Sequence, residues 1–178
     1  MLRNPAALAP ALGTSPPRAP LYTVEQRLRR DGSVWTRVQG VLAPVQFVVF
    51  LVSLALVLHF LLTGEAWGWA AGSVVVKTLT LYAIMLTGCI WEKVVFDCYL
   101  FAPAFFWEDV FSMLVLALHT AYLGALWTGA LDDTALMGLA LAAYAAYLIN
   151  AAQFLWKLRM ARLDEAHPSA ASCAGAAP

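Results

Sequence analysis

Residues 41–63, with the sequence VLAPVQFVVFLVSLALVLHFLLT, form a long apolar stretch that decides the class of this protein. The stretch contains no Asp, Glu, Lys or Arg. Its length is that of a membrane span, because about 20 helical residues cross the roughly 30 Å hydrocarbon core of a bilayer. The whole chain is 62% hydrophobic and only 12% charged, whereas a soluble domain is about 45–50% apolar and about 25% charged. The sequence therefore predicts a membrane protein.

Three more apolar segments of similar length follow the first one along the chain. The loops between them are short, so neighbouring helices should be antiparallel. We predict an all-α membrane protein with a four-transmembrane-helix bundle over residues 38–160. Its expected spans are approximately 41–63, 70–91, 105–128 and 134–157.

The segments outside the bundle differ from it in composition. Residues 21–37 are rich in Arg, and Thr23 with Gln26 has the spacing of a helix capping box. We expect a short basic interfacial helix here that is attracted to anionic lipid, although a solvated charged face explains the same pattern. The remaining segments, residues 1–20 and 161–178, are predicted to be disordered tails.

The Lys and Arg residues predict how the bundle is oriented. They gather before the first span, after the last span and in the second loop, whereas the first and third loops have none. By the positive-inside rule, both termini should be cytoplasmic. We expect the bundle to lie in the cytoplasmic (inner) membrane. The Trp residues divide between the two membrane interfaces in the same way. Trp35, Trp91, Trp107 and Trp156 fall at the cytoplasmic boundary, and Trp67, Trp69 and Trp127 fall at the opposite one.

Charge and cysteine content exclude several functions. The formal net charge is zero, which makes nucleic acid an unsuitable partner. Cys89, Cys98 and Cys173 match neither a disulfide framework nor a Cys-x-x-Cys metal motif, and we expect Cys89 and Cys98 to be packing residues. We therefore predict no metal site.

Each predicted span nevertheless carries polar residues along one face. In the third span Glu108, Ser112 and His119 are spaced by 4 and 7 residues and share one stripe, with Asp109 about 100° away. Because lipid would force such stripes to face one another, we expect a polar pocket inside the bundle that opens toward the cytoplasm. The other stripes consist of Tyr147, Asn150, Gln153 and Lys157 in the fourth span, Lys77 and Glu92 in the second, and Gln39, Gln46 and Ser53 in the first.

Several of these residues also have a purely structural explanation. Lys77 could extend its ammonium group to the membrane surface. A hydrogen-bonded core residue is favoured over a metal ligand for His119. Asn150 and Gln153 could equally serve to hold helices together.

The charged residues near the predicted cytoplasmic surface are open to two interpretations. Glu92 and Lys93 flank a helix end and could simply be interfacial. The adjacent acids Glu108 and Asp109 could simply begin a helix, because negative charge is stabilised at a helix N-terminus. However, they follow the aromatic run FFW inside an apolar segment, where two carboxylates are costly. This pair therefore marks a functional site.

Three stretches of the sequence resemble one known family. IWEKVVF at 90–96, YLFAPAFFWEDVFS at 99–112 and INAAQFLWKLR at 149–159 are similar to the 3-vinyl bacteriochlorophyllide hydratase family. The resemblance runs from about residue 19 to residue 163. These are small membrane proteins of bacteriochlorophyll biosynthesis in phototrophic bacteria. No residue roles are carried over from the family.

The resemblance implies the reaction. A hydro-lyase of this kind adds water across the 3-vinyl group of chlorophyllide a, or of a bacteriochlorin relative, and gives the 3-(1-hydroxyethyl) product. It implies no cofactor, since the substrate carries its own Mg. The expected partners are the tetrapyrrole substrate, the lipid bilayer and other bacteriochlorophyll-synthesis enzymes.

The polar residues suit this chemistry. Hydration needs an acid that protonates the terminal vinyl carbon and a base that accepts a proton from water, and two adjacent carboxyls sharing one proton supply both. Lys93, Lys157 or Arg159 could bind the substrate's propionate. We therefore predict Glu108, Asp109 and Glu92 as catalytic residues. The predicted substrate-binding residues are Lys93, His119, Tyr147, Asn150, Gln153, Lys157 and Gln46.

Two other functions are compatible with a polar membrane bundle. A non-catalytic tetrapyrrole-binding protein or pigment carrier would use His119 or His59 as an axial ligand. These two residues lie on different predicted spans at different depths, which argues against that alternative. A small transporter would usually show an inverted repeat, and the sequence shows none.

Overall fold

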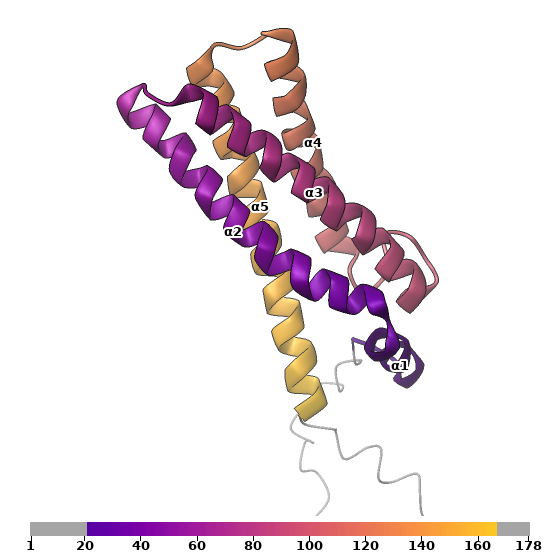
Figure 1. Cartoon of the computed structure of the whole chain (residues 1–178). Coiled ribbons are helices and arrows are strands. Elements are labelled where there is room, and N and C mark those ends of the chain that lie inside the picture. Colours follow the sequence, from indigo (N-terminus) through magenta and orange to yellow (C-terminus); the bar gives the residue numbers. More distant parts are fainter. Residues whose placement is uncertain (1–20, 167–178) are drawn as a thin grey trace, which may run out of the picture.

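The computed structural model describes residues 21–166, and every regular element in this range is a helix (Figure 1). Four of these helices are long and apolar enough to cross a membrane, which confirms the predicted helical class and the number of spans. The predicted tail at 1–20 and residues 167–178 of the predicted tail at 161–178 lie outside the described residues. The helices are α1 (Val24–Gly32), α2 (Val34–Thr63), α3 (Trp67–Phe96), α4 (Phe106–Thr128) and α5 (Asp133–Ala166).

Three of the four spanning helices, α2, α3 and α5, extend beyond their predicted spans. The third helix α3 begins at Trp67 and ends at Phe96, and α5 continues to Ala166, where the sequence predicted a tail from residue 161. The physical reason is that hydropathy locates only the part of a helix inside hydrocarbon. A helix continues into the interface as long as its backbone hydrogen bonds are made and no breaker intervenes.

The predicted interfacial segment 21–37 is divided at Ser33. The Ser33 N–H donates to the Arg30 carbonyl at 3.2 Å and closes α1, while its Oγ accepts from the Trp35 N–H at 3.2 Å and opens α2. Residues 34–37 therefore belong to the first spanning helix. The predicted capping box is confirmed, since Thr23 and Gln26 exchange side-chain to backbone hydrogen bonds at 2.9 and 3.2 Å.

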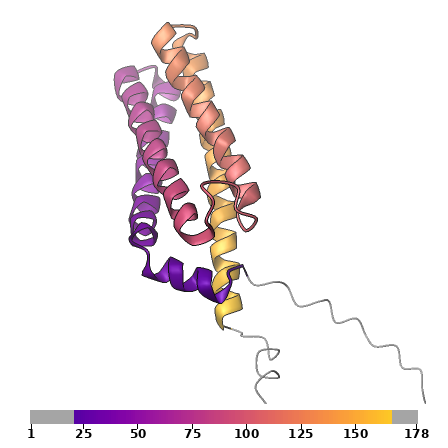
Figure 2. The ribbon, with the colours of Figure 1, turned by 90° about the vertical axis from the view of Figure 1, so that its right-hand side faces the viewer.

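The spanning helices pack as two hairpins. The pair α2–α3 and the pair α4–α5 each lie side by side, and α2 also contacts α5 across the bundle (Figure 2). The α2–α3 and α4–α5 loops lie at one end, at the top of both views. At the other end lie α1, the α3–α4 connection and the end of α5. Both ends of the described chain are thus on the same side of the bundle.

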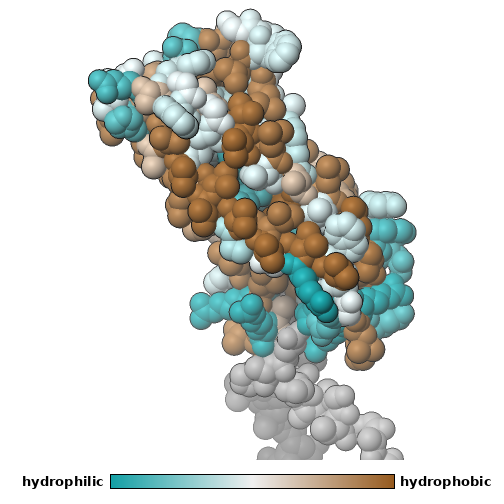
Figure 3. All heavy atoms as spheres, viewed as in Figure 1, coloured by the Kyte–Doolittle hydropathy of each residue, from teal (hydrophilic) through white to brown (hydrophobic). Residues whose placement is uncertain are grey.

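The surface agrees with a membrane location. Apolar side chains cover the middle of the face in Figure 3, and hydrophilic side chains gather toward its two ends. Exposed Trp residues mark both ends, with Trp69 75% and Trp127 92% exposed at one end and Trp107 66% exposed near the other. This distribution is that of aromatic belts at two interfaces.

Candidate functional site

The α3–α4 connection, residues 97–105, is fixed by aromatic side chains at the end of the bundle that carries α1. Phe105 is buried and stacks on Phe154 of α5 with ring centres 6.0 Å apart. It also makes T-shaped contacts with Trp91 and Phe96 of α3, whose ring centres lie 5.8 and 5.7 Å from its own. Such contacts tie the connection to α3 and α5 and fix the start of α4.

Beneath this connection lie two acidic side chains from different helices. Glu92 of α3 and Asp109 of α4 are 6% and 3% exposed. Their carboxyl groups are within hydrogen-bonding reach of each other. Among the described residues, neither group takes part in an ion pair. A buried pair of this kind holds a proton between the two carboxyls, because like charges this close cannot both be ionised.

Consecutive backbone N–H groups of the connection point at the acid pair. Phe101 donates to Oδ2 of Asp109 at 2.7 Å, and Ala102 donates to Oε2 of Glu92 at 3.4 Å. Phe101 has φ 60°, a left-handed conformation that costs a residue with a side chain about 1–2 kcal/mol. Strain of this kind persists only where surrounding contacts impose it, and it gathers at functional sites.

Glu108 has a different partner from its neighbour Asp109. Its Oε2 accepts from Nζ of Lys157 on α5 at 2.6 Å, and the same ammonium group donates to the Ala104 carbonyl. The predicted proton-sharing pair Glu108–Asp109 is therefore not brought together. Adjacent helical residues point about 100° apart, so one acid is turned toward α5 and the other toward α3.

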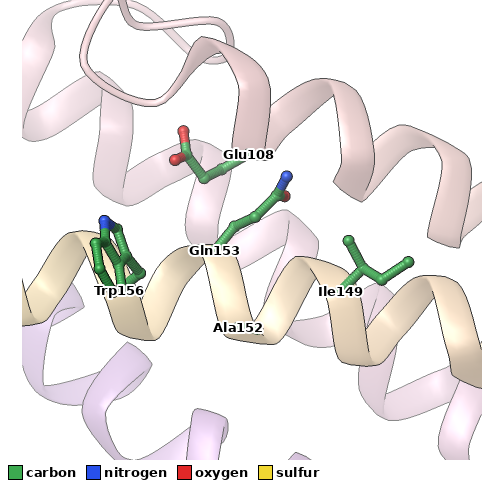
Figure 4. Close-up of a pocket in the computed structure, with 5 residues that line it drawn as sticks. All are labelled: Glu108, Ile149, Ala152, Gln153 and Trp156. Atoms are coloured by element: carbon green, nitrogen blue, oxygen red, sulfur yellow. The ribbon is translucent and has the colours of Figure 1, made fainter.

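A groove between α4 and α5 lies beside this ion pair. It has a volume of about 560 Å³, within the usual range of about 300–1,000 Å³ for small-molecule sites. Glu108 and Gln153 lie on the groove between the two helices, with Trp156 and Ile149 to either side (Figure 4). The Gln153 Oε1 atom is buried and has no hydrogen-bond partner in the described structure. The groove is thus an apolar surface with a few polar atoms available to a ligand.

The predicted α5 stripe is only partly directed at this groove. Asn150 turns toward α4, where its Nδ2 donates to Oγ of Ser112 at 2.9 Å. This contact matches the interpretation of Asn150 as a residue that joins helices.

A second polar cluster lies deeper in the bundle. Lys77 is fully buried, and its Nζ lies 3.6 Å from the centre of the Tyr147 ring. With its amide oxygen turned toward Lys77, Gln46 accepts from this Nζ at 2.8 Å and donates to the Thr80 carbonyl at 3.2 Å. The alternative in which Lys77 extends to the membrane surface is therefore wrong.

His119 belongs to the same deep region. Its Nδ1 lies 2.8 Å from the Val115 carbonyl oxygen, and its ring centre is 5.9 Å from that of Tyr144. No group of three or more potential metal ligands occurs in residues 21–166. His119 is buried and hydrogen-bonded to the backbone, which matches its interpretation as a core residue.

Sequence reasoning missed one part of this deep cluster. Tyr144 is buried, and its hydroxyl group forms a 2.5 Å hydrogen bond with Oγ of Ser53. The same Ser53 Oγ forms a 2.7 Å hydrogen bond with Oγ of Ser73. The available signal was the spacing of Tyr144 and Tyr147, since residues three apart share a helix face.

Lys93 stands apart from both clusters. Its Nζ donates to the Asp97 carbonyl at 2.7 Å and lies 5.6 Å from the Tyr99 ring centre. The Asp97 carboxylate accepts from Arg29 of α1 at 2.6 Å. This hydrogen bond holds the pKa of Asp97 below its usual range. Lys93 therefore supports the connection and does not face the acid pair.

These features define a class: a helical membrane protein with four spans, a buried carboxyl pair under an interfacial connection, and an adjacent apolar groove. Comparison with known proteins is more specific. Residues 22–160 match the family model of 2-vinyl bacteriochlorophyllide hydratase, and the chain belongs to this family. The family description gives the vinyl-bearing position the number 2, where the sequence-based expectation used 3.

Two curated relatives carry the same description. A 2-vinyl bacteriochlorophyllide hydratase of Cereibacter sphaeroides is 66% identical over 153 residues, which cover 85% of this chain and 95% of the relative. A protein of the same description from Rhodobacter capsulatus is 63% identical over 156 residues, 88% of this chain and 91% of the relative. No solved structure matches this chain.

Proposed function

We propose that this protein hydrates the vinyl group of a chlorophyllide-type tetrapyrrole in bacteriochlorophyll biosynthesis. The observation that carries the proposal is the family membership at 63–66% identity over most of the chain. The buried carboxyl pair of Glu92 and Asp109 supports it, since this reaction consists of one proton donation and one proton removal. The product is the corresponding 1-hydroxyethyl compound.

The reaction requires an acid and a base but no change in oxidation state. A proton added to the terminal vinyl carbon leaves positive charge on the carbon next to the macrocycle, which delocalises it. Water attacks that carbon and loses a proton. Positioned acid and base groups typically accelerate such steps by about 10²–10⁴-fold each. Glu92 and Asp109 together hold one proton and one free carboxylate, which is the state that the first step needs.

The groove between α4 and α5 is the proposed docking surface for the macrocycle. Trp156 and Ile149 offer apolar contact to a flat ring, and the unpartnered Oε1 of Gln153 offers a hydrogen-bond acceptor. Lys157 is engaged by Glu108 but remains 25% exposed, so it can bind the propionate of a docked substrate. The acid pair is buried under residues 97–105. This connection must therefore move before the vinyl group can reach Glu92 and Asp109.

We further propose that the site faces the cytoplasm of a phototrophic bacterium and that the bundle lies in its inner membrane. The support is the position of the Arg-rich helix α1 at the end of the bundle that carries the acid pair (Figure 1), where Lys157 also binds Glu108. Positively charged residues near spans are retained on the cytoplasmic side. In this orientation the substrate reaches the acid pair from the cytoplasm.

The proposal is tested by mass spectrometry of the product. Membranes that contain this protein are incubated with chlorophyllide a, and the pigment is expected to gain the mass of one water. Membranes with the Asp109→Asn variant at equal protein level serve as the control. A pigment that binds to the protein but never changes mass contradicts hydration and indicates a carrier.

Cofactor dependence gives a separate prediction. The proposed chemistry needs only carboxyl groups and water, so activity should survive dialysis against a chelator and should need no nicotinamide. The measurement is the hydration rate before and after chelation, with the absorption spectrum showing that the pigment keeps its Mg. A loss of rate with intact pigment, restored by added metal, contradicts the prediction.

A further inference from the structure

The two carboxyls of the buried pair have unequal surroundings. The Phe101 N–H donates to Asp109 over 2.7 Å, which is a short hydrogen bond for an N–H donor. The Ala102 N–H reaches Glu92 only at 3.4 Å, near the limit for a hydrogen bond. Backbone N–H groups stabilise the ionised form of a carboxyl and cannot accept a proton from the neutral form. The connection therefore favours the negative charge on Asp109.

The neighbouring charges leave this asymmetry in place. On α4 the nearest acid, Glu108, is paired with Lys157 of α5 at 2.6 Å. On α3, Lys93 is directed to the Asp97 carbonyl, and Arg29 of α1 binds the Asp97 carboxylate. The ion pair of Glu108 with Lys157 and the contacts of Lys93 and Arg29 with Asp97 thus direct these charges away from the acid pair.

We propose that Glu92 is the proton donor of the reaction and Asp109 is the base. This assignment rests on the proposed function and names the residue for each half of it. In the resting state Glu92 carries the shared proton and donates a hydrogen bond to the Asp109 carboxylate.

The proton balance of the cycle follows from this arrangement. The Glu92 O–H bond breaks and its proton forms a C–H bond at the terminal vinyl carbon, using the electron pair of the double bond. Water forms a C–O bond to the adjacent carbon, keeps one proton as the new hydroxyl group and gives the other to Asp109. The pair then holds the proton on the other carboxyl, and transfer from Asp109 to Glu92 restores the starting state. One water is consumed, and nothing is oxidised or reduced.

Infrared spectroscopy of the full-length protein in detergent tests the assignment without substrate. A protonated carboxyl gives a carbonyl stretch that is separate from those of carboxylates, and ¹³C in the carboxyl lowers its frequency. The protein is made by cell-free synthesis with either ¹³C-labelled Glu or ¹³C-labelled Asp. At neutral pH the protonated band should shift with labelled Glu and stay in place with labelled Asp.

Matched variants assign the infrared band of the protonated carboxyl to one residue. The band should be missing in Glu92→Gln and unchanged in Glu65→Gln, an exposed acid in the α2–α3 loop, and in Glu108→Gln. A band that shifts with labelled Asp, a band that survives Glu92→Gln, or no protonated band at all overturns the assignment. If Glu92→Gln fails to fold, the two labelled wild-type samples still decide between Glu and Asp. Because no turnover is measured, this outcome is independent of whether the protein hydrates chlorophyllide a.

Discussion

At the scale of single residues, the site depends on which way neighbouring acids point. Glu108 and Asp109 are adjacent in sequence, yet one binds Lys157 of α5 and the other lies against Glu92 of α3. Two carboxyls therefore have different chemistry in the same turn of helix. Glu108 forms an ion pair with Lys157, whereas Asp109 belongs to a pair that can pass a proton.

The first residue prediction concerns this pair. Glu92→Gln and Asp109→Asn should each reduce hydration by about 10²–10⁴-fold, because an amide keeps the size of the side chain but can neither donate nor accept the transferred proton. The measurement is the initial rate of hydroxyethyl product per amount of protein. Tyr82→Phe removes a hydrogen bond to Thr120 on an exposed part of α3 and serves as the control, with little expected change. A near-normal rate in either amide variant argues against the site.

The second residue prediction concerns Glu108 and Lys157. Glu108→Gln leaves an ammonium group without its counter-charge, which should cost about 1–3 kcal/mol of stability. Replacing both partners, in Glu108→Gln with Lys157→Gln, should recover part of this loss because no unpaired charge remains. Thermal unfolding in detergent measures both variants. A double variant that is less stable than the single one would show that Glu108 contributes through other contacts.

At the scale of secondary-structure elements, the short helix α1 is linked to the acid pair. Arg29 binds Glu25 within α1 at 2.7 Å and Asp97 of the α3–α4 connection at 2.6 Å. The same connection supplies the N–H groups of Phe101 and Ala102 to the acids. An interfacial helix thus helps to hold the segment that covers the site.

This link predicts a pH dependence of local order. Arg29 lowers the pKa of Asp97 in the folded protein. The contribution of the ion pair is therefore complete above the unfolded pKa of Asp, about 3.9, and is lost as the pH falls through the lower folded value. Protection factors of the Phe101 and Ala102 amides in hydrogen exchange should be constant near neutral pH and should decrease on acidification.

A variant reproduces the acid state at neutral pH. Asp97→Asn should lower the same protection factors by a small amount, because exposed ion pairs contribute little. Glu25→Gln is the matched control, since it removes the other partner of Arg29 and leaves the contact with the connection. If Asp97→Asn and Glu25→Gln behave alike, α1 does not hold the connection through Asp97.

At the scale of the whole molecule, two helical hairpins form an even number of spans. The α2–α3 and α4–α5 loops lie at one end, and the acid pair, α1 and the end of α5 lie at the other. This arrangement separates the loops without Lys or Arg from the basic segments. The proposed orientation, with both termini cytoplasmic, rests on this separation of charge.

Both termini are predicted to lie in the cytoplasm. Alkaline phosphatase, which is active only in the periplasm, should be active when fused after Gly64 or after Gly129, the left-handed residues that end α2 and α4. A fusion after Ala166 should be inactive. Activity of the Ala166 fusion, or inactivity of either loop fusion, would reverse or reject the topology.

The sequence by itself determined the membrane class, the four spans, the capping box of α1 and the family. These properties depend on composition and short-range periodicity, which act within one helix at a time. The tertiary structure alone decided the partners of the polar residues. Glu108 meets Lys157 across 49 positions, Asp109 meets Glu92 from another helix, and Lys77 is buried against Tyr147. Such contacts depend on how each helix is rotated about its axis and on the path of residues 97–105, which no single helix specifies.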